Sequence, residues 1–129
     1  MHKNKAFVQS ISNATSGLRT LLKEERNARF HLLATVCVIL VSIVFQINRL
    51  EWLFILSAIF LVWIAEAFNT SLEKLFDLVE PCKNKYVMAG KDLSAGGVLL
   101  SALLSVIIGA IILGPPIVKT IVSLLQNHK

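Results

Sequence analysis

Five polar residues near the middle of the chain have a spacing that puts them on one face of a helix. They are Glu66, Asn69, Thr70, Glu73 and Asp77, at positions i, i+3, i+4, i+7 and i+11. At about 100° per residue, these positions lie within roughly ±60° of one helical face. Carboxylate and amide oxygens in one row can bind a divalent cation, and a carboxylate can take a proton from a hydroxyl group. We call these five residues the acidic stripe.

The segment before the acidic stripe is strongly apolar. Residues 52–65 contain one serine hydroxyl group and no charged side chain. Carboxylates at the end of so apolar a helix are costly, and they are usually kept for a function. The alternative is that Glu66 and Glu73 form structural ion pairs with Lys or Arg on neighbouring helices. An amide and three acids aligned in one row favour a functional site.

The composition predicts a membrane protein with a single domain, residues 1–129. Of its 129 residues, 55% are hydrophobic and 16% are charged, and the mean hydropathy is +0.69. A soluble domain of this size could not bury so many apolar side chains. Cys37 and Cys82 lie in different kinds of segment, so we expect neither a disulfide nor a metal site from them. The N-terminal residues lack the apolar core of a signal peptide, so we expect no cleavage.

The hydropathy pattern predicts an all-α fold with an amphipathic surface helix and three transmembrane helices. The surface helix covers residues 4–24, and its polar face is basic. The spans cover residues 30–47, 50–79 and 92–113, and a tail follows at 114–129. A four-residue turn, 48–51, joins the first two spans. Pro81 is expected to end the second span, and the sequence Gly114-Pro115-Pro116 to end the third.

The distribution of Lys and Arg predicts the orientation in the membrane. Six of these residues precede the first span, one lies between the first two spans, and four lie between Lys74 and Lys91. The positive-inside rule therefore places the N-terminus and the second loop in the cytoplasm. In that orientation the following polar residues gather at the cytoplasmic ends of the helices: Glu25, Glu66, Asn69, Glu73, Asp77, Lys91 and Asp92.

These side chains could bind Mg²⁺ and a polyphosphate. Mg²⁺ prefers carboxylate oxygens together with substrate phosphates, and a lysine can neutralise charge on a phosphoryl group. The motifs of soluble nucleotide-binding proteins are missing from the sequence. Gly90-Lys91-Asp92 is similar to the end of a phosphate-binding loop, but Lys85 stands where that loop begins with Gly, and Asp92 replaces Ser or Thr.

Two motifs resemble those of the small bacterial integral-membrane diacylglycerol kinases and undecaprenol kinases. Residues 66–73, EAFNTSLE, are similar to the family signature E-x-x-N-[ST]-[AS]-[IL]-E. Lys91-Asp92 with the small-residue helix after it resembles the second family motif, and residues 25–29, ERNAR, resemble the juxtamembrane segment. The resemblance covers about residues 7–113.

The resemblance implies a lipid kinase that uses ATP and Mg²⁺ and forms a homotrimeric bundle in the bacterial inner membrane, with active sites shared between subunits and no nucleic-acid partner. It implies that Glu66 is the general base and that Glu25 and Glu73 are metal ligands. The implied nucleotide-binding residues are Asn69, Asp77, Lys91 and Asp92. The implied lipid-binding residues are Arg29, Glu66 and Ala95. The acceptor would be undecaprenol or diacylglycerol, and the juxtamembrane pattern up to His31 is more similar to the undecaprenol kinases.

Two other classes of protein remain open from the residues alone. A small transporter or proton-relay protein could use the acidic stripe, but a relay needs polar groups across the whole membrane. The first and third predicted spans have no charge at their centres. A structural subunit of a larger complex would be consistent with the small size and the glycine-rich third span, but this class of protein would not explain the acidic stripe.

Overall fold

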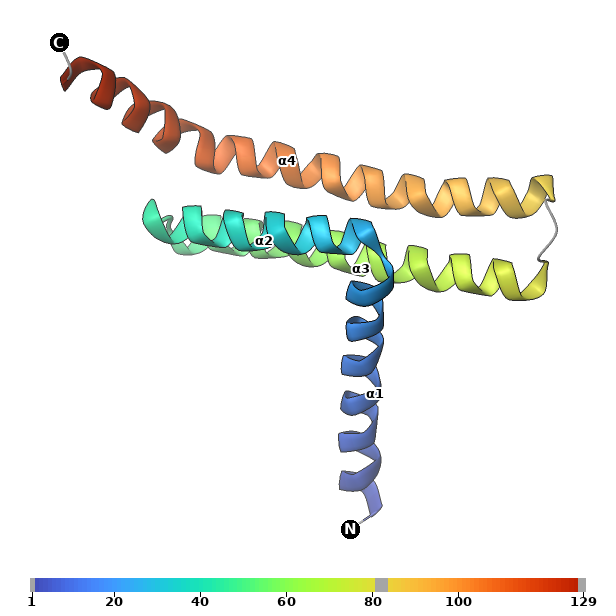
Figure 1. Cartoon of the computed structure of the whole chain (residues 1–129). Coiled ribbons are helices and arrows are strands. Elements are labelled where there is room, and N and C mark those ends of the chain that lie inside the picture. The colour runs from blue at the N-terminus through green and yellow to red at the C-terminus, as the bar shows by residue number, and fades with distance from the viewer. Residues whose placement is uncertain (1, 81–83, 128–129) are drawn as a thin grey trace.

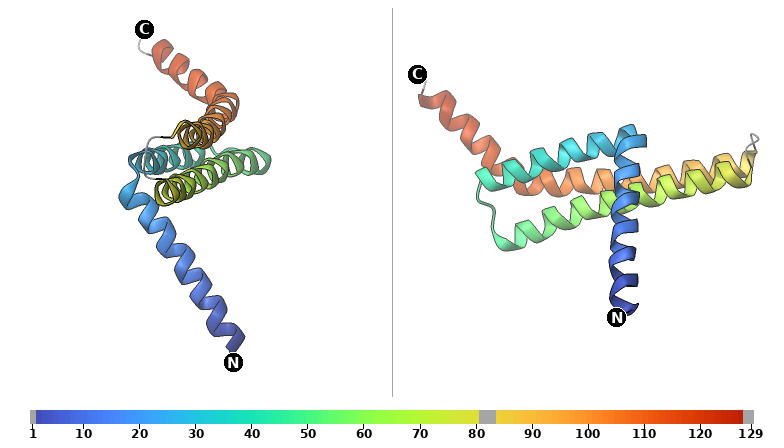
Figure 2. Two further views of the ribbon diagram at one scale, coloured as in Figure 1. Left: turned by 90° about the vertical axis from the view of Figure 1, so that its right-hand side faces the viewer. Right: turned by 60° about the horizontal axis from the view of Figure 1, so that its bottom comes forward.

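The computed structural model describes residues 2–80 and 84–127, and this part of the chain forms four helices (Figure 1). They are α1 (His2–Glu24), α2 (Arg26–Val44), α3 (Arg49–Val79) and α4 (Lys85–Asn127). Helices α2, α3 and α4 lie side by side, and α1 projects sideways from this bundle (Figures 1 and 2). The predicted all-α fold is therefore confirmed.

Helices α2, α3 and α4 are each long and apolar enough to cross a membrane, as predicted for three spans. With 19 residues, α2 is about 28 Å long at 1.5 Å per residue, close to the ~30 Å hydrocarbon layer. With 31 residues, α3 is longer than this layer is thick. The end of α3 that carries Glu73 and Asp77 can therefore extend out of the membrane.

Helix α1 has the features of a helix that lies on a membrane surface. Its apolar side chains Phe7, Val8, Ile11 and Leu18 are all exposed in the single chain. Near its end, Leu21 is buried against the bundle, and Glu24 forms an ion pair with Lys74 of α3. The end of α1 is thus held against the bundle, close to Thr70 of the acidic stripe.

The turn between α2 and α3 is fixed by a capping box. The Asn48 side chain accepts hydrogen bonds from the backbone amides of Leu50 (2.9 Å) and Glu51 (3.1 Å). In return, the Asn48 backbone amide donates to Glu51 Oε2 at 2.7 Å. These bonds satisfy amide groups that the first turn of a helix leaves without partners. A short turn is therefore present and has a clear local cause, but it covers residues 45–48, and residues 49–51 of the predicted turn belong to α3.

The prediction that Gly114-Pro115-Pro116 ends the third span is wrong, because α4 continues through both prolines to Asn127. Proline removes a backbone donor and crowds the preceding turn, which commonly bends a helix without ending it in apolar surroundings. The C-terminal part of α4 accordingly bends away from the other helices (Figure 2). The tail predicted at 114–129 is helical as far as Asn127.

The other helix ends differ from the predicted spans by a few residues. Helix α2 begins at Arg26 and ends at Val44, and α4 begins at Lys85, seven residues before the predicted third span. Hydropathy locates only the apolar part of a helix, whereas these helices extend into polar sequence at the membrane interface. Cys37 is a free cysteine on α2. The predictions made for Pro81 and Cys82 concern residues outside those that the structure describes.

Helix α4 packs along α3, and Gly90 lies close to Phe76 of α3. A Cβ atom at Gly90 would lie 2.5 Å from Phe76 Cζ, so a side chain there would require the Phe76 ring to move. Deeper in the bundle, Ser105 Oγ donates to the Ala58 carbonyl at 3.1 Å. The close approach at Gly90 brings the next residue, Lys91, beside the acidic stripe.

Candidate active site

The acidic stripe runs from the buried interior of the bundle to its exposed end. Glu66 and Thr70 are buried, with exposed fractions of 2% and 7%. Asn69 and Glu73 are half-buried, and Asp77 is exposed. Because the five residues share one face of α3, they form a continuous row of decreasing burial, as the sequence spacing predicts.

Asn69 links the acidic stripe to α4. Its Nδ2 donates to Glu73 Oε1 at 3.0 Å, and its Oδ1 accepts a hydrogen bond from Ser94 Oγ at 2.7 Å. Ser94 was not predicted as a polar partner from the sequence, because it lies among small residues that suit helix packing. Its position one helical turn after Lys91 was the available signal. These bonds fix the Glu73 carboxylate and the Asn69 amide in one orientation.

Lys91 and Asp77 form an ion pair between α4 and α3 at the exposed end of the acidic stripe. Asp92, the next residue, is exposed. The predicted nucleotide-binding residues thus cluster at two levels: Asn69 lies beside Glu73, and Lys91 with Asp77 lies further out. Polyphosphates are long enough to contact both levels.

Glu66, Asn69 and Glu73 open onto a groove of about 360 Å³, which we call the polar groove. The predicted lipid-binding residue Ala95 also lines it, from α4. The remaining lining residues come from α2 and α4: Asn27, Phe30, His31, Val98, Leu99 and Ala102. Arg29, the other predicted lipid-binding residue, is exposed and lies outside this lining. Also outside the lining are Asp77 and Asp92, which are exposed, and Glu25 and Lys91, which are half-buried.

Within the described residues, the Glu66 carboxylate has a buried oxygen, Oε1, that accepts no hydrogen bond. The imidazole of His31 lies nearest among basic groups, with Nε2 3.7 Å from this oxygen. The charges of Glu25 and Glu73 also act on Glu66, and both are repulsive. A buried carboxylate without a hydrogen-bond donor is energetically costly, so this arrangement needs a functional explanation.

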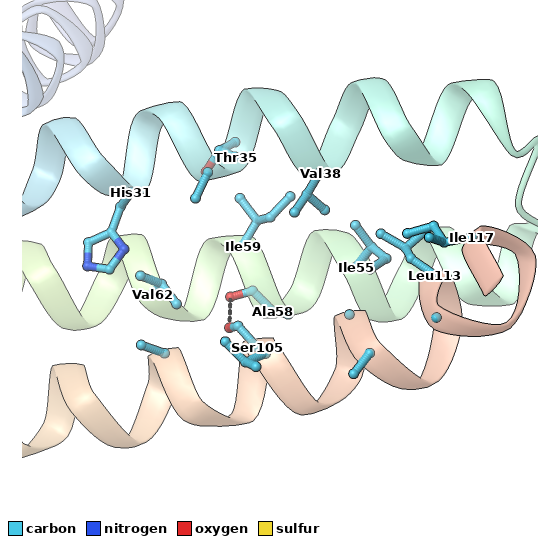
Figure 3. A pocket seen from close by; sticks show the side chains of 16 residues that line it. His31, Thr35, Val38, Ile55, Ala58, Ile59, Val62, Ser105, Leu113 and Ile117 are labelled. Carbon is cyan, nitrogen blue, oxygen red and sulfur yellow. Dashed lines mark hydrogen bonds between the residues drawn. The ribbon is translucent and has the colours of Figure 1, made fainter. Parts of the chain in front are cut away.

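The polar groove leads at His31 and Ala102 into an apolar cavity of about 490 Å³ between α2, α3 and α4. Figure 3 shows His31 at one end of this cavity and Leu113 and Ile117 at the other. The walls between them are almost entirely aliphatic, from residues such as Val38, Ile55 and Ile59. Polar and apolar spaces therefore meet at His31.

The predicted metal ligands, Glu25 and Glu73, belong to different helices. Glu25 is the N-cap residue of α2, and its side chain makes no capping hydrogen bond. Glu24, which precedes Glu25, forms an ion pair with Lys74, which follows Glu73. Among residues 2–80 and 84–127, no three His, Cys, Asp or Glu side chains are grouped to hold a metal without help. Two carboxylates that share an ion with substrate phosphates are nevertheless a normal donor set for Mg²⁺.

The fold and the site define a multi-pass membrane protein with a buried carboxylate in a polar groove, which shares His31 and Ala102 with an apolar cavity. The chain belongs to the prokaryotic diacylglycerol kinase family, because residues 12–113 match the family model "Prokaryotic diacylglycerol kinase". It is therefore a membrane lipid kinase, a phosphotransferase that acts on an alcohol group. This result confirms the family resemblance and favours the kinase over the transporter alternative.

Two curated relatives are similar over most of the chain. An undecaprenol kinase of Bacillus subtilis is 31% identical over 116 residues, which cover 88% of this chain and 94% of the relative. A diacylglycerol kinase of Synechocystis sp. is 32% identical over 114 residues, which cover 88% of this chain and 65% of the relative. The two identities are nearly equal, so the similarity does not decide between the two acceptors.

Proposed function

We propose that this protein transfers the γ-phosphoryl group of ATP to the hydroxyl group of undecaprenol at the cytoplasmic face of the membrane. The observation that carries this proposal is the buried Glu66 carboxylate, which lines the polar groove 3.7 Å from His31, a residue at the boundary with the apolar cavity. A long-chain alcohol has a single polar group, which must reach a base at such a boundary. Glu66 is the most deeply placed acid of the acidic stripe.

In the proposed reaction, Glu66 accepts the proton of the lipid hydroxyl group as its oxygen attacks the γ-phosphorus of ATP. A new oxygen–phosphorus bond forms, and the bond between the γ-phosphorus and the bridging oxygen breaks. The electron pair of that bond leaves with ADP. The products are the lipid phosphate, ADP and a protonated Glu66, which returns its proton to water.

The remaining site residues have roles in binding the nucleotide. ATP would be contacted by Asn69, Asp77, Lys91 and Asp92. Lys91 would break its ion pair with Asp77 and bind a phosphate oxygen instead. Arg29 and Ala95 would contact the lipid near its headgroup. Glu25 and Glu73 would hold Mg²⁺, which neutralises charge on the phosphates when bound.

Undecaprenol is favoured over diacylglycerol by the family resemblance, because the juxtamembrane sequence from Glu25 to His31 resembles that of the undecaprenol kinases more closely. Diacylglycerol is the second candidate, because the other relative has that activity in its name.

A competition assay tests the acceptor. The purified full chain in mixed detergent micelles is given γ-labelled ATP, Mg²⁺ and equal mole fractions of undecaprenol and diacylglycerol. We expect labelled undecaprenyl phosphate as the main product, with kcat/KM at least tenfold higher than for diacylglycerol, a difference of about 1.4 kcal/mol. Preferential labelling of diacylglycerol would contradict the acceptor, and labelling of neither lipid would contradict the proposed reaction.

Glu25→Gln and Glu73→Gln are each expected to weaken the apparent affinity for Mg²⁺ by at least about tenfold, because each removes a negatively charged oxygen ligand. The measurement is the initial rate as a function of Mg²⁺ at saturating ATP, and high Mg²⁺ should partly restore both variants. Glu24→Gln is the matched control, since it removes the same charge from the residue beside Glu25. If both variants lose activity with an unchanged Mg²⁺ dependence, these residues are not the metal ligands.

A further inference from the structure

We infer that His31 is a positioning residue that orients the Glu66 carboxylate for proton transfer. This inference rests on the proposed role of Glu66 as the base. His31 was noted in the sequence only as part of the juxtamembrane pattern, and its relation to Glu66 arises from the packing of α2 against α3. It therefore adds a residue to the site beyond those predicted from the sequence.

The contact between these two residues is specific. His31 Nε2 lies 3.7 Å from Glu66 Oε1, the same oxygen that has no hydrogen-bond partner among the described residues. The Glu66 side chain is 3% exposed and that of His31 is 24% exposed, so water has little access to the pair from the Glu66 side. Figure 3 shows the His31 ring projecting from α2 towards α3, at the end of the apolar cavity.

The distance is too long for a hydrogen bond. A small rotation of the imidazole would close it, and catalytic hydrogen bonds are often long before substrate binds. The other charges that act on Glu66 come from α2 and α3, namely Glu25 at the N-cap of α2 and Glu73 on α3, and both repel its carboxylate. The imidazole of His31 can instead donate an N–H group to this carboxylate from Nε2. It is thus suited to keep this carboxylate in one orientation.

The location of His31 is also appropriate for this role. His31 lines both the polar groove and the apolar cavity, a property it shares with Ala102 across the bundle on α4. A lipid hydroxyl group that reaches Glu66 from the apolar side must pass this boundary. An imidazole there can hold one carboxylate oxygen while the other oxygen faces the hydroxyl group, in the way that a base is oriented by a third group.

A pair of amide substitutions tests the inference. The side-chain nitrogen of Gln can take the place of His Nε2, whereas that of Asn reaches only to the place of Nδ1. His31→Gln and His31→Asn therefore carry the same amide group at different distances from the backbone. Each full-length variant is purified in detergent, and kcat and KM are measured for ATP·Mg²⁺ and for the lipid alcohol that the wild type phosphorylates. Circular dichroism and gel filtration check the folding of both variants.

We expect His31→Asn to lower kcat by about 10- to 100-fold, the usual effect of losing a hydrogen bond to a charged group, with KM for ATP·Mg²⁺ changed less than about twofold. His31→Gln should retain most of the wild-type kcat. In a Glu66→Gln background, His31→Asn should cause no further loss, because a residue that acts through Glu66 has no effect once the base is gone. Should His31→Asn fail to fold, His31→Ala provides the same comparison.

Thr35→Val is the matched control, since Thr35 lies one turn further along α2, lines the same apolar cavity and donates no group to Glu66. Its kcat should remain within about twofold of the wild type. Equal losses in the Gln and Asn variants, an unchanged kcat in His31→Asn, or a loss in Thr35→Val as large as in His31→Asn would each overturn the inference. A wild-type protein that phosphorylates no lipid alcohol would instead overturn the proposed function, so the two failures are distinguishable.

Discussion

Glu66→Gln is expected to lower the rate of phosphoryl transfer by about 10²- to 10⁴-fold, while ATP·Mg²⁺ binds nearly as well as to the wild type. Glutamine has almost the shape of glutamate but cannot accept the proton of the lipid hydroxyl group. The predicted nucleotide-binding residues lie further along α3 and on α4, so this substitution leaves their contacts in place. The measurement combines single-turnover transfer from labelled ATP with nucleotide binding by calorimetry.

The matched control for this prediction is Glu51→Gln, at the other end of α3. Glutamine can replace glutamate in a capping box, so the helix start should be retained while one acidic charge is lost. We expect Glu51→Gln to turn over at about the wild-type rate. Near-normal turnover of Glu66→Gln would remove Glu66 from the mechanism, and a parallel loss of nucleotide binding would assign it to the nucleotide site.

The elements that carry strong periodicity or hydropathy could be predicted from the sequence. The row from Glu66 to Asp77 is local to one helix, so its spacing alone placed these residues on one face. The same is true of the three apolar spans. The predicted end of the third span was wrong, because the effect of Pro115 and Pro116 depends on what surrounds the helix. In apolar surroundings the helix bends at these prolines and continues.

The contacts between helices could not be predicted in the same way. His31 lies 35 positions before Glu66, and only the packing of α2 on α3 brings its imidazole to 3.7 Å from the carboxylate. Ser94 and Asn69 meet only because α4 packs along α3. A pattern within one helix contains no information about which residue of another helix will face it. The sequence therefore indicated the residues that do chemistry better than those that position them.

The second large effect concerns the association of subunits. We propose a homotrimer, as the family resemblance implies, because one chain does not enclose all the predicted nucleotide-binding residues. Asp77 and Asp92 are exposed at the outer end of the acidic stripe. A neighbouring subunit could cover this end and exclude water from the reacting groups.

The position of Lys91 gives a reason to test whether sites are shared. Its ammonium group is paired with Asp77, which lies 11 residues after Glu66 on α3, or about 16 Å along the helix axis. A phosphoryl group in transit spans only a few ångströms. Lys91 must therefore leave Asp77 and turn towards Glu66 of its own chain, or else the lysine that serves a given Glu66 belongs to a neighbouring chain.

Mixing two inactive variants distinguishes these arrangements. Glu66→Gln subunits and Lys91→Ala subunits are combined in equal amounts in detergent, exchanged, and assayed. In a ring of three, about three quarters of randomly mixed trimers contain both variants, and each of these has one junction with an intact Glu66 and an intact Lys91 from adjacent chains. If sites are shared in this way, about a quarter of all sites should be active.

The expected result is recovery of roughly a quarter of the wild-type rate from two preparations that are each nearly inactive. Differently tagged subunits, recovered together on one affinity resin, show that exchange has taken place. If exchange is complete and the mixture remains inactive, Glu66 and Lys91 act within one chain, and Lys91 must break its pair with Asp77 when the nucleotide binds. In that case the next mixing test combines Glu25→Gln subunits with Glu66→Gln subunits. Glu25 lies at the junction of α1 and α2, on a different helix from the acidic stripe, so a neighbouring subunit could equally supply it.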